Sequence, residues 1–584
     1  MFAQKEQDLP AYHIRYDFFI SKFCQMCHFE TNLSSITNSI RVSGLQGIGG
    51  VVRKIENENL AGNIWDPTHM DKIIPSLLYN IQIGDYKAGH TRSQTPDLDD
   101  GKSKSPLQIA EDTFRKLMGR AGFQSMKPVM KPILNHLDIH QMWTPPDFAE
   151  HVFQMVMFSI QQQVNYIIIE ELMKHLDKKQ DNVMVKVGIA TVLSRIFSSR
   201  AVDASVGPSV LETINALLIH LKTSVEKAQA SRDPDPDHQR YHEALLTALG
   251  EYSSSLPNFQ MIEIMMFILS KTPDDVNEND SVGSELQHVL LKALLTVAEK
   301  FVPVQFGNTF PLTFLSPLLD KLQSPDPDAR LLVLRIFQTL IDRKNNLEKL
   351  ELLTVEPRSD LLAQKPNSNK QDNSFFEKYG ERIYRELLSV IRVEAVGIEF
   401  LEQFYMTVSL LALEVNSDDN IRLQLELVGE LQELALSNNN NKLRLSDANK
   451  FALHATCISL LSIISFVVRI PDIFEYKDKL VSLRKSLVPH LLPPLEEDYN
   501  PDLDPTAHIE EALIELEPVK AALRDAGRYS ERGVRVGSVM VGSRGSSPST
   551  RRPPSWLETA HIRRPSGVSL SSVEVNITPQ PFVS

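Results

Sequence analysis

The sequence predicts an all-α protein: an armadillo/HEAT-like helical-repeat solenoid that forms an elongated rod and ends in a disordered C-terminal tail. Apolar residues recur every three or four positions through most of the chain, which is the spacing of one helix face. A basic residue between two apolar neighbours opens such a run at four widely separated places. The sequence has no convincing hairpin turns and no sustained alternation of apolar and polar residues, so we expect no sheet.

Length and composition agree with this fold class. The chain has 584 residues, and 42% of them are hydrophobic. Such a chain is too long for one compact hydrophobic core, so it forms either several domains or one extended stack. Recurring helical units favour the stack, because each repeat buries its apolar face only against its neighbours.

The four basic residues that head these runs are the recurrent feature of the sequence. We expect each of them to bridge to acidic groups between adjacent helices or to face solvent in a loop. Because the copies lie far apart along the chain, they indicate an architecture and not a chemistry. The four heads are Ile40-Arg41-Val42, Val185-Lys186-Val187, Ala329-Arg330-Leu331 and Ile421-Arg422-Leu423.

Helix signals appear in order along the chain. Asp66-Pro67 predicts a helix start, with the carboxylate as N-cap and proline at the first helical position. Apolar residues at helical spacing then predict helices over 211–221, 262–269 and 290–295.

The longest apolar run covers residues 457–468. Its length of roughly a dozen residues is below the about 18 that a membrane-spanning helix needs. Ser459, Ser462 and Ser465 also interrupt the run. We therefore expect a buried core helix at this position.

Polar segments separate the predicted helices. A solenoid accepts such insertions because each repeat contacts only its neighbours. We predict an N-terminal and central helical-repeat region over 1–350, a polar linker over 351–374 and a C-terminal helical region over 375–525. The polar segments are 84–106, 231–237, 272–284, 356–374 and 438–441.

The composition changes after about Ala526. Residues 526–584 contain eight arginines and no lysine against three glutamates, a local charge of +5, and Ser, Gly and Pro replace the apolar periodicity. This composition is typical of a disordered tail. Arginine pairs precede Ser555 and Ser566, as basophilic kinases require, so both are candidate phosphorylation sites. A phosphate would add about two negative charges beside the arginines.

The net charge and the number of cysteines argue against a general nucleic-acid-binding protein and against a disulfide-stabilised protein. The net charge is −13 and the pI is about 5.7, which disfavours general nucleic-acid binding because that requires a basic surface. Cys24, Cys27 and Cys457 are too few for a disulfide framework and are typical of a reducing compartment.

Three short patterns have the spacing of metal ligands but lack the remaining ligands of a site. Neither histidine pair carries the His-Glu-x-x-His sequence of zinc proteases. We interpret all three patterns as half-buried or helix-end residues, and we expect no metal and no other cofactor. The patterns are Cys24-Gln25-Met26-Cys27-His28, His136 with His140, and His238 with His242.

Catalytic motifs are incomplete in the same way. Gly101-Lys102-Ser103 ends like a phosphate-binding loop, but Pro96 occupies the position of the required upstream glycine. A Gly-x-Ser-x-Gly nucleophile elbow occurs nowhere in the sequence. We therefore expect no catalytic residues.

The N-terminal half contains more specific sequence motifs. Through these motifs the chain resembles the Efr-three/rolling-blackout family of plasma-membrane scaffolds. The resemblance covers about residues 12–350 and is much weaker beyond about 375. It rests on Tyr12-His13-x-Arg15-Tyr16-Asp17-Phe18-Phe19, on 41–54 ending in Gly50-Val51-Val52-Arg53-Lys54, on Ile64-Trp65-Asp66-Pro67 through Pro75-Ser76-Leu77-Leu78, and on parts of 136–161, 207–212 and 263–267.

The resemblance implies a rod of armadillo/HEAT-like repeats that is not an enzyme. Family members recruit a phosphatidylinositol 4-kinase complex to the inner plasma membrane and support phosphoinositide synthesis. The implied partners are lipid kinase complex subunits and, weakly, anionic inner-leaflet lipid, with a peripheral location on the cytoplasmic face. The residues expected to set helix starts and stacking are Trp65, Asp66, Pro67, Pro75 and the four basic heads.

The chain departs from the family pattern at its start. Members carry a palmitoylated N-terminal cysteine cluster, whereas residues 1–10 contain no cysteine. We expect a shortened form that lacks the acyl part of the anchor, with the cytosol as the alternative location. Two other functions stay open. One is a cargo adaptor of the nuclear-transport type, and the other is a lipase, which the missing serine elbow disfavours.

Overall fold

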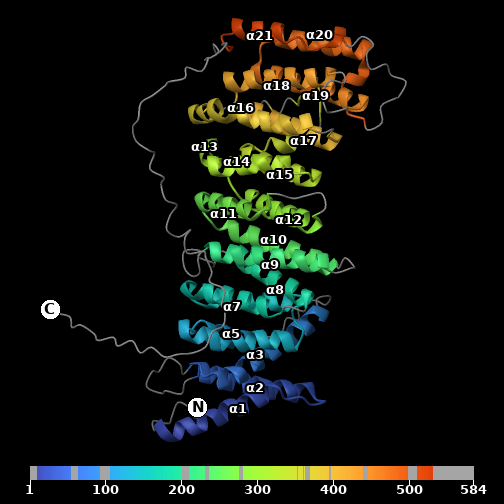
Figure 1. The fold of residues 1–584 in the computed structure, drawn as a ribbon. Coiled ribbons are helices and arrows are strands. Elements are labelled where there is room, and N and C mark those ends of the chain that lie inside the picture. Colours follow the sequence, from blue (N-terminus) through green and yellow to red (C-terminus); the bar gives the residue numbers. More distant parts are fainter. Residues whose placement is uncertain are drawn as a thin grey trace, which may run out of the picture. The chain divides into compact units, whose positions relative to one another are not determined.

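Every regular element that the structure describes is a helix, and the helices stack layer upon layer (Figure 1). The structure is a computed structural model in which residues 1–530 form one unit. The predicted all-α helical-repeat solenoid is therefore confirmed. The described residues are 9–53, 64–91, 105–179, 182–199, 210–230, 236–274, 280–350, 353–358, 361, 369–393, 396–437, 445–496 and 510–529.

The helices form two rows, and along each row most helices contact the next member of the same row. The first row consists of α1 (Leu9–Cys27), α3 (Pro67–Thr91), α5 (Phe123–Ile139), α7 (Asn165–Lys178), α9 (Val210–Ala230), α11 (Asn258–Lys271), α14 (Leu312–Asp320), α16 (Lys370–Val393) and α18 (Asp418–Leu436). The second row consists of α2 (Ser34–Arg53), α4 (Pro106–Met118), α6 (Asp147–Ser159), α8 (Val183–Ser198), α10 (Pro236–Ser254), α12 (Ser281–Ala298), α15 (Pro327–Ile341), α17 (Ile398–Glu414) and α19 (Asp447–Val468).

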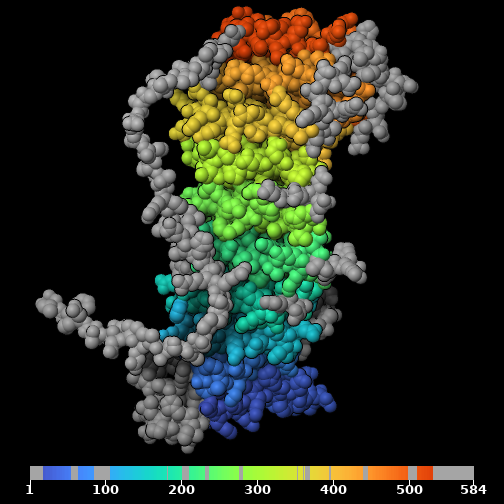
Figure 2. All heavy atoms as spheres, in the orientation of Figure 1, coloured from blue at the N-terminus to red at the C-terminus, as the bar shows by residue number. Residues whose placement is uncertain are grey.

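Three further helices complete the stack. They are α13 (Phe306–Thr309) beside α16, α20 (Pro471–Leu487) on α19, and α21 (Leu516–Asp525) on α20. Short 3-10 turns lie between helices: η3 (Gln162–Val164), η4 (Lys321–Gln323), η5 (Leu347–Lys349), η7 (Pro489–Leu491) and η8 (Glu510–Ala512). In Figure 2 the colours, which follow the residue number, form consecutive bands. Each layer therefore borders the layers that precede and follow it in the sequence.

Side-chain caps determine where many helices begin. Ser105 accepts from the backbone N–H of Gln108, whose side chain in turn accepts from the N–H of Ser105, which is a complete capping box. Each cap satisfies a backbone N–H that the helix leaves unpaired and stabilises the protein by about 1 kcal/mol. Other described helices whose first turn receives such a side-chain cap include α3 (Asp66), α8 (Asn182), α12 (Asp280), α15 (Asp326), α16 (Asn369), α18 (Ser417) and α19 (Ser446).

The apolar run 457–468 lies in α19. The most apolar 18-residue window of this helix has a mean hydropathy of 2.2, so by length and composition alone α19 is the one described helix that could cross a bilayer. That entire window is buried, however, and α17, α18 and α20 pack around it. Ser459 and Ser462 donate to the carbonyls of Ala455 and Ile458 within the same helix, which satisfies their hydroxyls. The predicted buried core helix is confirmed.

The first predicted polar segment starts too early, because α3 continues past Gly84 to Thr91. A Cβ atom at Gly84 would lie 2.7 Å from the Cβ of Leu107. This glycine therefore allows α4 to pack closely on α3 and does not end the helix. Likewise, α16 begins at Lys370, inside the segment predicted to be polar up to residue 374.

Helices from both sides of the predicted linker 351–374 contact each other. α15 packs on α17, and α13 packs on α16. The proposed domain boundaries stay a prediction. The tail predicted over 526–584 falls outside the described residues from residue 530 onward.

Candidate functional site

Arg41 organises a polar cluster that joins the first layers of the stack. Its side chain lies in the second turn of α2, and the residue is only 5% exposed. Nε donates to the carbonyl of Phe29 at 2.9 Å, and Nη2 donates to Oε1 of Glu30 at 3.0 Å. The guanidinium carbon lies 5.3 Å from the ring centroid of Tyr79 in α3. Arg41 therefore ties the turn between α1 and α2 to the next helix of the first row.

Hydrogen bonds and burial shift the pKa values of the titratable groups in this cluster. The Tyr79 hydroxyl donates to Oε1 of Glu30 at 2.6 Å, and this bond together with the charge of Arg41 holds the pKa of Glu30 below its ordinary value. Burial, and then the bond to Glu30, raises the pKa of Tyr79. His28 packs on the Tyr79 ring and lies 3.1 Å from Oγ of Ser76, and burial lowers its pKa. The cluster is thus a Glu–Arg ion pair beside an imidazole whose burial disfavours its charged form.

The Trp65-Asp66-Pro67 sequence lies at the start of α3, as predicted. Oδ1 of Asp66 accepts from the backbone N–H of Thr68 at 2.9 Å and from its hydroxyl at 2.7 Å, which lowers the pKa of the carboxyl. Pro67 is the first residue of the helix, and Trp65 packs half-buried against the core. Pro75 lies inside α3, where it removes one backbone donor from the helix.

The remaining basic heads occupy different layers. Lys186 in α8 is 8% exposed, and its Nζ lies 5.5 Å from the ring centroid of Tyr241 in α10. Arg330 in α15 is 5% exposed. Arg422 differs, because it lies in the first row, in α18, and pairs with Glu426 of the same helix at 2.5 Å. Three heads therefore belong to the second row and one to the first, and they do not form a common site.

The cysteine and histidine patterns are packing residues. Burial raises the pKa of Cys24 and Cys27, so both thiols stay protonated at neutral pH. The rings of His136 and His140 lie 4.4 Å apart, and burial followed by the charge of His140 lowers the pKa of His136 to about 4. Among the residues that the structure describes, no group of three or more His, Cys, Asp or Glu side chains could hold a metal ion. Ser555 and Ser566 lie outside the described residues.

Two serine–histidine pairs in the described part of the chain lie within hydrogen-bond distance: Ser76, which is 1% exposed, with His28 as described above, and Ser224 with His238. Oγ of Ser224 lies 2.9 Å from Nδ1 of His238. Ser224 is only 4% exposed and lies within α9, so a bulky substrate cannot approach its hydroxyl in this conformation. We interpret the contact as a structural hydrogen bond between α9 and α10.

Sequence reasoning assigned no role to the side-chain contacts of Trp143. This residue is 1% exposed, and its Nε1 donates to Oδ1 of Asp138 at 2.8 Å. The same carboxylate is contacted by His175 of α7 at 3.1 Å and by Lys179, the residue that follows α7, at 2.8 Å. Burial acts to raise the pKa of Asp138, but these three hydrogen bonds outweigh it and bring the pKa to about 2. The sequence signal that could have identified it is the scarcity of tryptophan, with three in the chain, together with the two prolines that follow Thr144.

Arg343 connects helices far apart in the sequence, and no sequence signal announced it. Its Nη1 donates to Oδ2 of Asp372 at 2.6 Å, and its Nε donates to Oε2 of Glu414 at 3.0 Å. Asp372 and Glu414 are 1% and 0% exposed. The guanidinium carbon also lies 4.4 Å from the ring centroid of Phe306. This one cation therefore bridges the ends of α15, α16 and α17.

Arg484 is fully buried at the last layer. Its Nε donates to the carbonyl of Ala512 at 3.0 Å, and its Nη1 donates to the carbonyls of His454 and Leu491 at 2.9 and 3.1 Å. Burial lowers its pKa to about 10. Because its partners are carbonyls on α19, η7 and η8, Arg484 fastens the turns after α20 onto the stack.

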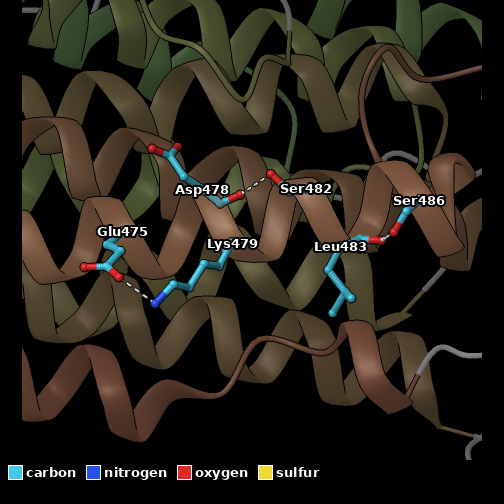
Figure 3. Close-up of a pocket in the computed structure, with 6 residues that line it drawn as sticks. All are labelled: Glu475, Asp478, Lys479, Ser482, Leu483 and Ser486. Carbon is cyan, nitrogen blue, oxygen red and sulfur yellow. Dashed lines mark hydrogen bonds and ion pairs between the residues drawn. The ribbon is translucent and has the colours of Figure 1, made fainter.

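The outward face of α20 carries a shallow, open pocket (Figure 3). Nζ of Lys479 pairs with Glu475 at 2.6 Å, and the hydroxyl of Ser482 donates to the carbonyl of Asp478 at 2.8 Å. This face of α20 is mainly polar, and the hydrogen bonds and ion pair named here form within the one helix. The lining residues are Glu475, Asp478, Lys479, Ser482, Leu483 and Ser486.

Comparison with known proteins matches the chain to one family model over residues 1–524, and that model is described as EFR3, armadillo repeat. The chain is 38% identical over 502 residues to the EFR3 homolog cmp44E of Drosophila melanogaster and covers 58% of that protein. It is 34% identical over 517 residues to the human EFR3 homolog A and covers 62% of it. These alignments include 85% and 84% of the present chain.

Among solved structures, the chain is similar to Kap121p bound to RanGTP, with 13% identity and a TM-score of 0.32. That alignment covers 83% of the present chain and 51% of the other. The chain spans about three fifths of the length of the curated relatives that it matches.

Proposed function

Because the chain belongs to the EFR3 armadillo-repeat family, we propose that it is a non-catalytic scaffold that recruits a phosphatidylinositol 4-kinase complex to the plasma membrane and so supports phosphoinositide synthesis. The observation that carries this proposal is the family match over residues 1–524. A stack of helical repeats is consistent with it, since such stacks offer long surfaces to protein partners.

The polar clusters also favour a scaffold. Arg41, Arg343 and Arg484 are engaged with carboxylates and carbonyls that hold neighbouring helices together. Burial raises the pKa of Glu414 although Arg343 acts to lower it, so the position of this carboxylate between the helices determines the direction of its pKa shift. Perturbed pKa values mark catalytic sites when the groups line a cleft. Here the groups lie between helices, where they contribute to stability.

A protein at the membrane surface needs an attraction to anionic lipid. The net charge of the helical body does not supply this attraction. Residues 1–525 carry a formal charge of −18, whereas residues 526–584 carry +5. Anionic lipid repels an acidic body, and each basic residue near the surface contributes about 1 kcal/mol of attraction. We therefore propose the basic segment 526–584 as one contact with inner-leaflet lipid, which phosphorylation of Ser555 and Ser566 would weaken.

The proposal is tested in cells that lack their own EFR3 homolog. The tagged chain is expressed alone and as a fusion to a doubly acylated membrane-targeting peptide, which supplies a membrane anchor. We expect the fusion to co-purify a phosphatidylinositol 4-kinase and to raise phosphatidylinositol 4-phosphate at the plasma membrane. A membrane-bound fusion that recovers no lipid kinase subunit and leaves the lipid unchanged would contradict the proposal.

The same preparations separate the two other functions. A lipase predicts turnover of diacylglycerol that one serine substitution abolishes, either Ser224→Ala or Ser76→Ala, because each of these serines lies within hydrogen-bond distance of a histidine. A nuclear-transport adaptor predicts binding of basic cargo peptides. We expect neither activity from the purified chain.

A further inference from the structure

Helix α11 has an apolar face on each side. One face is the core stripe, in which Met261, Ile264 and Met265 are at most 2% exposed. On the opposite face Phe259, Ile262 and Met266 follow at the spacing i, i+3, i+7. A helix at the surface of a soluble protein normally carries polar residues on its outer side. On this face Phe259 is 63% exposed, whereas Ile262 and Met266 are half-buried and also pack against the core, so the face is apolar and partly open to solvent.

Neighbouring segments extend this face. Nδ2 of Asn258 donates to the carbonyl of Val302 at 2.9 Å, which places the segment after α12 beside the start of α11. The hydroxyl of Thr313 lies 3.4 Å from Sδ of Met266, which places α14 beside the middle of α11, and the two helices are neighbours in Figure 1. Phe259, Val302 and Leu312 are 63%, 66% and 48% exposed. We call the residues Phe259, Ile262, Glu263, Met266, Val302 and Leu312 the α11 patch.

Glu263 is the charged member of the patch. It lies at i+4 from Phe259, and around the helix it is flanked by Phe259 and Phe267. Within the described ranges its carboxylate has no recorded hydrogen bond or ion pair, and burial alone raises its pKa. A carboxylate that is partly desolvated by apolar neighbours and lacks a cation favours a ligand that supplies one.

We propose that the α11 patch is a docking site for an amphipathic helix of a protein partner, and that this helix places a lysine or arginine opposite Glu263 between its apolar side chains. The chemistry is that of a helix laid along an apolar groove, with anchors at i, i+3 and i+7 and one ion pair that sets the register. This inference goes beyond the proposed recruitment of a lipid kinase and does not depend on it.

Charge favours such a partner over the two other classes of occupant. An anionic lipid surface would bring negative headgroups against Glu263 and its carboxylate toward hydrocarbon, and both contacts are unfavourable. A second copy of the chain that docked patch to patch would bring like carboxylates near each other. A cationic apolar helix satisfies the carboxylate and covers the phenyl ring of Phe259.

The test selects peptides on the whole chain. A displayed library of helical peptides carries apolar residues at i, i+3, i+4 and i+7 and random residues elsewhere, and Phe259→Ser protein serves as the counter-target. Binding of the selected peptides is then measured by fluorescence anisotropy with Glu263→Lys and Phe259→Ser. Matched controls are Glu243→Lys, an exposed glutamate of α10, and Phe158→Ser, a phenylalanine of α6 that is 77% exposed. Circular dichroism verifies that each variant is folded.

We expect selected peptides to be enriched in lysine or arginine next to their apolar anchors. Their affinity should fall by about tenfold or more with Glu263→Lys and with Phe259→Ser, and should not change with the controls. Replacing the basic residue of a peptide by glutamate should restore binding to Glu263→Lys protein.

Several results would overturn the proposal. One is a selection that yields no peptide dependent on Phe259, and another is peptides without basic enrichment. A third is flotation with vesicles of 30% phosphatidylserine that is lost with Phe259→Ser, which would assign the patch to lipid. The last is a dimer in light scattering that Phe259→Ser dissociates, which would assign the patch to a second copy.

Discussion

His454 lies in the middle of α19 with 1% of its surface exposed. Burial, then the charges of Arg484 and His490, lowers its pKa to about 3. In the unfolded chain the same imidazole has a pKa of about 6.5. Between these values the unfolded chain binds a proton that the folded chain does not, so stability falls as the pH drops below about 6.5.

Replacing His454 by leucine should therefore flatten the dependence of stability on pH. Between pH 7 and pH 5 the wild-type chain should lose about 2 kcal/mol more than the variant, because each pKa unit corresponds to about 1.4 kcal/mol. Urea unfolding at both pH values measures the difference. His288→Leu, at a half-buried histidine of α12, is the matched control. Parallel curves for wild type and His454→Leu would contradict this account.

Individual residues were the hardest level to predict from sequence. Arg41 was identified because it interrupts an apolar helical run. Arg484 also lies in such a run, but its importance comes from the carbonyls of Leu491 and Ala512, which reach it only when the chain folds back. Periodicity identifies which residues face the core, and it cannot show which backbone groups meet them there.

At the scale of elements, Trp143 and α8 show how closely helices approach. A Cβ atom at Gly188 would lie 2.2 Å from the carbonyl oxygen of Trp143. The indole nitrogen of Trp143 is bound to Asp138, so the loop before α6 is held at both ends of this residue. The absence of a side chain at Gly188 thus allows the loop to pack against α8, and in this position the side chain of Trp143 is buried.

We expect Gly188→Ala to destabilise the chain by about 1–3 kcal/mol, because backbone must move to accept the methyl group. Gly50→Ala is the control within α2, where the nearest atom would be the Nη2 of Arg53 at 3.8 Å. That change should stabilise by about 0.5–1 kcal/mol through helix propensity. Thermal unfolding compares the two variants. Equal shifts in the same direction would refute the close-approach argument.

Elements were predicted well from sequence because helices follow from local periodicity. The runs at 211–221, 262–269 and 290–295 all lie inside described helices. The row that each helix occupies depends on its partners, and this is why Arg422 looked equivalent to Arg330 although the two lie in different rows. Gly84 illustrates the other limit, since a glycine that permits close packing has the same sequence signal as one that ends a helix.

At the scale of the whole molecule, Arg343 connects helices on both sides of the predicted linker. Its two partners, Asp372 and Glu414, are buried carboxylates 29 and 71 residues further along the chain. The removal of one partner from a buried ion pair leaves the others uncompensated, which typically costs about 3–5 kcal/mol.

The variant Arg343→Leu should therefore weaken the contact between α15 and α17 more than any local change in α15. We expect a lower urea midpoint and faster proteolytic cleavage within residues 351–369. Arg335→Leu is the control, because Arg335 is an exposed residue of α15, the helix that ends two residues before Arg343. Unchanged cleavage in Arg343→Leu would show that the bridge does not couple the two regions.

The charge difference between the helical body and the tail gives a second prediction at this scale. We expect the purified chain to bind anionic liposomes weakly and to lose that binding when residues 526–584 are deleted, because the deletion removes the segment with a charge of +5. Sedimentation with liposomes at two salt concentrations measures the effect. Binding that survives the deletion would exclude this role of the tail.

The composition of α19 has a consequence for the synthesis of the protein. As the nascent chain leaves the ribosome, a 22-residue helix that contains an 18-residue window of mean hydropathy 2.2 resembles the segments that the membrane-insertion machinery accepts. Its neighbours α17 and α18 have already been made at that moment, whereas α20 has not. Vectorial folding from the N-terminus thus gives α19 a ready protein surface before it is complete. The order of helices along the chain protects this helix from mistargeting.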